Sequence, residues 1–123
     1  MSVEVPAGVA LAGERVVVFG GGAGSAVFAA ACAAAGARVH LVSPWACNEL
    51  QDLVRGRLVT WSRRNHHGGD VAGACLVFAG SAERRVNVAV ELEADRRRIR
   101  CVRDDTGLPV DGGLLPAQRR SGA

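Results

Sequence analysis

The sequence of 123 residues contains no lysine and no tyrosine, and aromatic residues make up only 4% of it. With so few aromatic side chains, the core must be built from valine, leucine and alanine. No apolar run approaches the ~20 residues that a membrane-spanning helix needs, so we expect no membrane partner. Residues 1–13 lack a basic start followed by an apolar block, so we expect no secretory signal and a cytoplasmic protein.

Cysteine pairs at a metal-binding or redox spacing are also absent. The four cysteines are Cys32, Cys47, Cys75 and Cys101, and no two of them form a C-x-x-C pair. Most of them fall inside expected helices or strands. We therefore expect buried, reduced thiols rather than a metal site or a disulfide framework.

The charge is unevenly distributed along what we expect to be a single domain. All fifteen basic residues are arginine, the net charge is +3, and seven of the arginines lie from residue 96 onward. Two interpretations remain open: a solvated helix end, where arginine is favourable beside the helix dipole, or a surface for an anionic partner. No aromatic residue interleaves with these arginines, so we expect no nucleic-acid partner.

Residues 15–26 carry the most informative pattern, an apolar run that leads directly into a cluster of glycines. An alanine-rich segment suited to a helix follows, and a second apolar run begins soon after Gly36. This order of strand, glycine turn, helix and strand opens dinucleotide-binding units. Gly20 allows the tight turn, Gly22 lets a pyrophosphate approach the backbone, and Ser25 is small enough for close helix packing. The alternative is a tight turn whose glycines serve the backbone alone.

Apolar runs and helical patterns alternate along the rest of the chain. They predict strands over residues 15–19, 38–42, 58–61, 74–79 and 99–102, and helices over residues 24–35, 47–55 and from a cap at Ser81 to about residue 95. This alternation predicts the α/β class: a Rossmann-like parallel sheet of about five strands in the order 3-2-1-4-5, with helices on both faces. We expect a dinucleotide-binding domain over residues 1–106 and a tail rich in glycine, proline and arginine over residues 107–123.

Ligands of such sheets bind beyond the carboxyl ends of the strands, where the strand order reverses. Three segments are expected to meet there, residues 20–25, 79–82 and 103–106. The acidic residue that would bind the ribose of NAD after the second strand is missing, and Ser43 or Asn48 could make a weaker ribose contact. The candidate cofactor-binding residues are Gly20, Gly21, Gly22, Ala23, Gly24, Ser25, Ser43, Gly80 and Ser81.

A further candidate is the histidine-containing segment of residues 65–70, Asn-His-His-Gly-Gly-Asp. Adjacent histidines on an extended chain point to opposite faces, so a metal site there would need a turn and additional ligands. A polar surface loop is the alternative, and we expect no bound metal.

Several short motifs follow one another in an informative order. They are Leu11-Ala-Gly13, the valine-rich residues 16–19, Gly20 to Gly22, Ala35-Gly-Ala-Arg-Val39, Val42-Ser-Pro44, Val86-Asn87 and Leu115-Pro-Ala117. Together these motifs resemble the amino-terminal NAD-binding domain of siroheme synthases, the precorrin-2 dehydrogenase family. The similarity covers about residues 9–117 and lies in the order and spacing of the motifs.

The resemblance implies a reaction and a cofactor. Members of the family oxidise precorrin-2 to sirohydrochlorin with NAD+ as hydride acceptor, and some also insert Fe2+ to give siroheme. The family's catalytic aspartate lies just after the fifth strand, which implies that Asp105, beside Asp104, accepts a proton. Because the substrate carries many carboxylates, the resemblance also implies counter-charges at Arg100, Arg103 and Arg119.

The sequence also departs from the family's pattern. Val27 and Phe28 stand where a basic residue is usual, and Val102-Arg-Asp104 replaces Asn-Val-Val before the catalytic position. We also expect this protein to lack the dimerisation region and the helical domain that follow the Pro116 position in the family. We therefore expect a precorrin-2 dehydrogenase-like enzyme, with a homodimer or a partner chain supplying the missing region. The alternative is a non-catalytic NAD-binding module that acts through a partner subunit.

Overall fold

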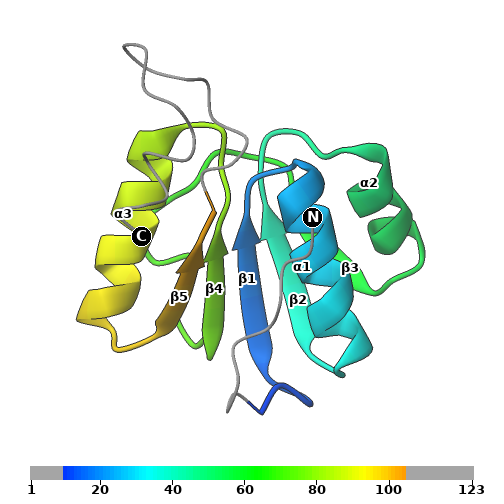
Figure 1. Cartoon of the computed structure of the whole chain (residues 1–123), viewed down its shortest axis with the longest axis horizontal. Helices are drawn as coiled ribbons and strands as arrows, with labels where there is room; N and C mark the ends of the chain where they lie inside the picture. The colour runs from blue at the N-terminus through cyan, green and yellow to red at the C-terminus, as the bar shows by residue number, and fades with distance from the viewer. Residues whose placement is uncertain (1–9, 105–123) are drawn as a thin grey trace.

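The computed structural model describes residues 10–104 (Figure 1). Asp105 and the predicted tail at residues 107–123 lie outside this range. Parallel strands form one five-stranded sheet in the order β3-β2-β1-β4-β5, so the predicted fold class and strand order are confirmed. The elements are β1 (Arg15–Phe19), α1 (Ala23–Ala34), β2 (Arg38–Val42), α2 (Asn48–Arg55), β3 (Val59–Ser62), β4 (Leu76–Ala79), α3 (Arg84–Arg96) and β5 (Arg100–Arg103).

Strand β1 lies at the centre of the sheet because its side chains are apolar on both faces. Residues 16–19 are completely buried. Val17 lies opposite His40 of β2 on one side and opposite Val77 of β4 on the other. A parallel sheet that is covered on both faces requires such continuous apolar strands. The chain order reverses between β1 and β4, and their carboxyl ends lie side by side there.

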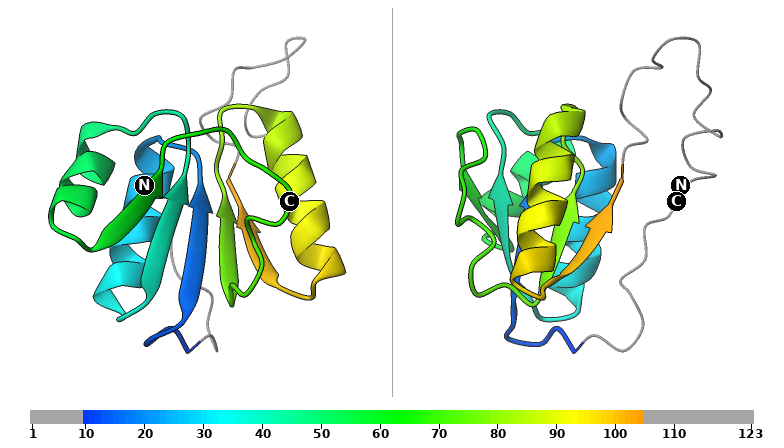
Figure 2. Two further views of the ribbon diagram at one scale, coloured as in Figure 1. Left: turned by 180° about the vertical axis from the view of Figure 1, so that it is seen from behind. Right: turned by 90° about the vertical axis from the view of Figure 1, so that its left-hand side faces the viewer.

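Helices α1 and α2 cover one face of the sheet, and α3 covers the other together with the segment between β3 and β4. Figure 2 shows this segment from behind, crossing the sheet without a helix of its own. The alanines of α1 let it lie close to the sheet, and Phe28 stacks on Phe78 of β4 with ring centroids 4.5 Å apart. On the opposite face, Val71 and Val90 are completely buried. No helix within residues 10–104 is long and apolar enough to cross a membrane.

Strands β3 and β5 begin one residue later than predicted because the preceding helices close with an extra turn residue. Arg57 and Arg98 adopt left-handed conformations, with φ of 62° and 58°. The N–H groups of Leu58 and Ile99 consequently donate back to helix carbonyl oxygens, at 3.0 and 2.8 Å, instead of starting the next strand.

The prediction that Ser81 caps the last helix is wrong. Helix α3 begins at Arg84, and no side chain caps it. The hydroxyl of Ser81 instead accepts a hydrogen bond from the N–H of Glu83 at 3.0 Å, which fixes the turn ahead of the helix. Strand β4 also begins at Leu76 rather than at Ala74, because the preceding residues form turns.

Candidate dinucleotide-binding site

The turn after β1 contains three glycines whose surroundings differ. Gly20 has a φ of 105°, and a Cβ atom there would overlap the carbonyl group of Gly80. A Cβ atom at Gly21 would overlap the carbonyl oxygen of Trp45. At Gly22 a Cβ atom would meet nothing within 4 Å among the residues that the structure describes. Packing within the protein accounts for the first two glycines, whereas the space beside Gly22 is open.

Gly22 is also the N-cap residue of α1, and a glycine supplies no side-chain cap of its own to this helix end. The first turn, which includes the predicted residues Ala23 and Gly24, contains no acidic residue. The N–H groups and the dipole at such an end favour an anion. The glycine turn and the helix end therefore form one cradle that suits a phosphate group.

The end of β5 reaches the same cradle. Asp104 follows β5, and its N–H donates to the carbonyl oxygen of Ala79 at 3.0 Å. Its carboxylate lies beside Gly24, where a Cβ atom would be 2.6 Å from Oδ2. The three segments expected to converge thus do so over their described residues. The resemblance implied Asp105 as the acid, but the carboxylate that the structure places beside α1 is that of Asp104.

Ser25 is buried rather than open to a ligand. Its side chain is 1% exposed, and its Oγ has no hydrogen-bond partner among the described residues. The hydroxyl lies against Gly80, where a Cβ atom would be 3.1 Å from it. Ser25 is therefore placed as the small residue that lets α1 pack against the loop after β4.

A buried asparagine holds the loop after β4. Asn87 of α3 is completely buried. Its Oδ1 accepts a hydrogen bond from the N–H of Ser81 at 2.8 Å, and its Nδ2 donates to the carbonyl oxygen of Ser81 at 2.9 Å. One side chain thus satisfies both backbone groups of Ser81. Sequence reasoning found Asn87 only as part of a motif and missed this role.

A pocket of about 170 Å³ lies where β1 and β2 end. Its polar lining residues come from the turn after β2, from the β3–β4 segment and from the loop before α3, and they are Ser43, Asn65, His66, Ser81 and Glu83. The lining includes one carboxylate and no arginine.

Ser43 lies in this pocket, but the backbone already uses its hydroxyl. The residue is 2% exposed, and its Oγ donates to the carbonyl oxygen of Trp45 at 2.6 Å. The carbonyl oxygen of Ser43 in turn accepts a hydrogen bond from the indole of Trp61 at 2.9 Å. Ser43 therefore shapes the turn after β2, and a ribose contact from its hydroxyl would compete with that internal hydrogen bond.

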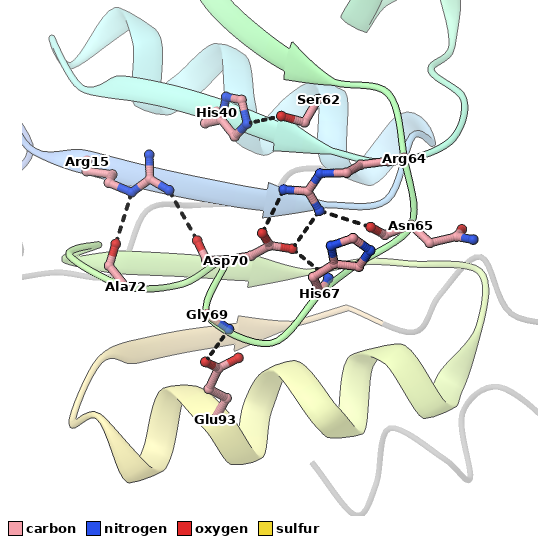
Figure 3. A network of polar contacts seen from close by, with 10 residues as sticks. All are labelled: Arg15, His40, Ser62, Arg64, Asn65, His67, Gly69, Asp70, Ala72 and Glu93. Carbon is pink, nitrogen blue, oxygen red and sulfur yellow. Dashed lines mark hydrogen bonds and ion pairs between the residues drawn. The ribbon is translucent and has the colours of Figure 1, made fainter.

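A network of polar contacts fixes the β3–β4 segment (Figure 3). Arg64 donates to both carboxylate oxygens of Asp70, at 2.8 and 3.1 Å, and the N–H of His67 donates to the same carboxylate at 2.7 Å. Arg15 of β1 donates to the carbonyl oxygen of Asp70 at 3.1 Å. The segment is thus tied to the sheet although it contains no helix.

The Asp70 carboxylate makes this segment sensitive to acid. Burial alone would raise the pKa of Asp70, but hydrogen bonds from Arg64 and the His67 N–H, with nearby positive charge, outweigh it and lower the pKa. The carboxylate therefore stabilises the fold above its unfolded pKa of about 3.9, and this contribution is lost as the pH falls through the folded value.

We expect Asp70→Asn to lower Tm at neutral pH by about 3–8 °C, with the difference from wild type shrinking below about pH 4. Thermal unfolding of wild type and variant at several pH values measures the Tm difference. A Tm difference that stays constant in acid contradicts the prediction, as does an equal loss of Tm in the exposed control variant Asp95→Asn.

The cysteines and histidines form no metal site within residues 10–104. No group of three His, Cys, Asp or Glu side chains there could hold a metal ion. All four cysteines are free, as expected, but only Cys32 is fully buried. Burial, with the charge of Glu91, raises the pKa of Cys101 to about 11, so this thiol stays protonated at neutral pH.

Comparisons with known proteins agree with this geometry. Residues 8–108 match the family described as "Putative NAD(P)-binding". The "Probable multifunctional siroheme biosynthesis protein HemA" of Ruminiclostridium josui is 29% identical over 89 residues, which are 72% of this chain and 17% of that protein. The siroheme synthase of Photorhabdus laumondii is 34% identical over 95 residues, which are 77% of this chain and 20% of that protein. The chain thus spans about a fifth of the length of these curated relatives.

A solved structure shares the fold. The precorrin-2 dehydrogenase SirC matches with a TM-score of 0.69 at 18% identity, over 91% of this chain and 54% of that chain. At this identity the likeness concerns the fold alone, and it agrees with the strand order described above. The family match covers most of the chain, and the resemblance to siroheme synthases and precorrin-2 dehydrogenases is confirmed. The chain therefore belongs to the putative NAD(P)-binding family.

Proposed function

We propose that the chain binds NAD+ and serves in the oxidation of precorrin-2 to sirohydrochlorin. The observation that carries the proposal is the open space beside Gly22, at the amino-terminal end of α1, in a turn where Gly20 and Gly21 are closely packed. A phosphate group fits such a cradle because the backbone can approach it and the helix N–H groups can donate to it. The siroheme synthases among the relatives support the choice of pathway.

We infer that NAD is preferred over NADP. The extra 2′-phosphate of NADP needs a cation near the end of β2. The pocket beside that end is lined by no arginine and by one carboxylate, that of Glu83. A phosphate would therefore meet repulsion and no counter-charge, whereas the uncharged hydroxyl of NAD would not.

The proposed oxidation removes two electrons and two hydrogens from the tetrapyrrole. Bound NAD+ would supply the acceptor for the hydride that leaves a substrate carbon. The accompanying proton would pass to Asp105, the position implied by the resemblance, with Asp104 beside the cradle as the neighbouring carboxylate. Exposed Arg100 could face substrate carboxylates, whereas Arg103 is already paired with Glu91 at 3.1 Å.

We propose that a second copy of the chain or a partner chain contributes to the tetrapyrrole site. The departure at Val102-Arg-Asp104 from the family's pattern favours a second candidate function, a module that binds NAD without turnover and acts through a partner.

The experiment measures NAD+ binding by calorimetry and precorrin-2 oxidation by the appearance of NADH. We expect Asp105→Asn to reduce oxidation by about a hundredfold or more while NAD+ affinity stays unchanged. Asp104→Asn separates the two neighbouring carboxylates, and Asp111→Asn is the matched control. NAD+ binding without any oxidation by this chain alone, even at high protein concentration, would favour the module that acts through a partner. Absence of NAD+ binding would reject both.

A further inference from the structure

His66 carries a buried ring nitrogen that lacks a partner. Its Nε2 is shielded from solvent and makes no hydrogen bond within the described part of the chain. A buried polar atom of this kind is costly, and native proteins rarely leave one unsatisfied. Ser25 Oγ is the other such side-chain atom within residues 10–104, and it lies in the packing between α1 and the loop after β4. His66, by contrast, lines the pocket at the ends of β1 and β2.

The imidazole of His66 is held in place from two directions. Its ring packs edge-on against Phe19 of β1, with ring centroids 5.6 Å apart and an interplanar angle of 76°. The neighbouring residues belong to the network around Asp70, in which Asn65 and His67 flank it in sequence (Figure 3). On the far side of that network, the N–H of Gly69 donates to Glu93 of α3 at 2.8 Å. A side chain fixed in this way is preorganised for a contact.

The same pocket contains the turn after β2, where dinucleotide-binding folds hold the adenosine ribose. That turn offers no acidic residue, and the Ser43 hydroxyl already donates to the backbone. A ribose placed there would lack its usual partner. His66, which carries the orphaned nitrogen, is one of the residues that line this pocket, and an imidazole nitrogen can accept a hydrogen bond from a hydroxyl or donate one to it.

We propose that His66 binds a hydroxyl of the adenosine ribose of NAD, in place of the acidic residue that is usual after the second strand. The proposal rests on the proposed function, since it needs the dinucleotide to bind. It gives the β3–β4 segment a role in ligand binding, because the network around Asp70 then positions a ribose-binding residue. His67, which is exposed and does not line the pocket, has no such role.

The test compares NAD+ with NAD+ that lacks the 2′- or the 3′-hydroxyl of the adenosine ribose. We expect wild type to bind one of the two deoxy forms about five- to tenfold more weakly than NAD+, the usual effect of one hydrogen bond. His66→Phe keeps the aromatic contact with Phe19 and removes the nitrogen, so it should bind NAD+ and that deoxy form equally weakly. His67→Phe is the matched control and should behave as wild type.

The outcomes separate this proposal from the one on which it rests. If wild type binds NAD+ and both deoxy forms equally well, or if His66→Phe retains full discrimination, the role of His66 is rejected while NAD binding stands. If wild type binds none of the three ligands, the proposed function itself fails. Should His66→Phe fold poorly, His66→Ala provides a second variant, which should lose the same discrimination; discrimination that it retains rejects the role of His66.

Discussion

Valine in place of Gly22 is expected to weaken NAD+ binding by about a hundredfold or more while leaving the fold intact. Loss of the charged hydrogen bonds between a phosphate and the helix end accounts for an effect of this size, about 3 kcal/mol. The fold tolerates the side chain because a Cβ atom at Gly22 meets nothing within 4 Å in the described structure, and the residue has an ordinary φ of −91°. Calorimetric titration measures the affinity for NAD+. The free energy of unfolding, obtained from thermal unfolding, should change by less than about 1 kcal/mol.

The matched comparison is Gly20→Ala, two positions earlier in the same turn. Gly20 has a φ of 105°, and its added Cβ would overlap Gly80, so we expect a loss of about 3 kcal/mol or more in stability. A loss of binding in that variant reports on folding, whereas a loss in Gly22→Val reports on the ligand. Unchanged NAD+ affinity in Gly22→Val would show that the pyrophosphate does not lie on this turn.

The strand order and the position of the cradle could be predicted because both depend on local patterns. Residues 16–19 are a continuous apolar run, and such runs form central parallel strands. Glycines directly after the run place the turn, and alanines after the glycines place α1. These signals lie within a few residues of the features that they determine, so one sequence is enough to find them.

The roles of single residues could not be predicted because they depend on contacts between distant segments. The glycine pattern assigns a role to Gly20 and Gly22 but gives no sign that Gly21 packs against the carbonyl group of Trp45. A ligand-binding role for His66 can be inferred only from the structure, which leaves its Nε2 without a partner and places the residue in the same pocket as the turn after β2. Ser81 was expected to cap the last helix, but its hydroxyl serves the turn before that helix and its backbone is held by Asn87.

Replacing Asn87 with alanine is expected to cost about 2–4 kcal/mol of unfolding free energy. The substitution leaves the N–H and the carbonyl oxygen of Ser81 without their side-chain partner, and each unsatisfied buried group costs about 1–3 kcal/mol. The loop after β4 lines the pocket, so its loosening should also weaken NAD+ binding. Urea unfolding gives the free energy, and hydrogen exchange at the Ser81 amide reports on the loop.

Two variants decide whether this effect comes from the two hydrogen bonds. Val88→Ala alters the next residue of α3, whose side chain is 38% exposed, and should change stability by less than about 1 kcal/mol. Asn87→Asp keeps an oxygen that accepts from the Ser81 N–H but loses the donor to the Ser81 carbonyl, so the amide should stay protected while stability still falls. If Asn87→Ala leaves exchange at Ser81 unchanged, the side chain contributes packing alone, and the loop must be held by its other contacts with β1 and Glu83.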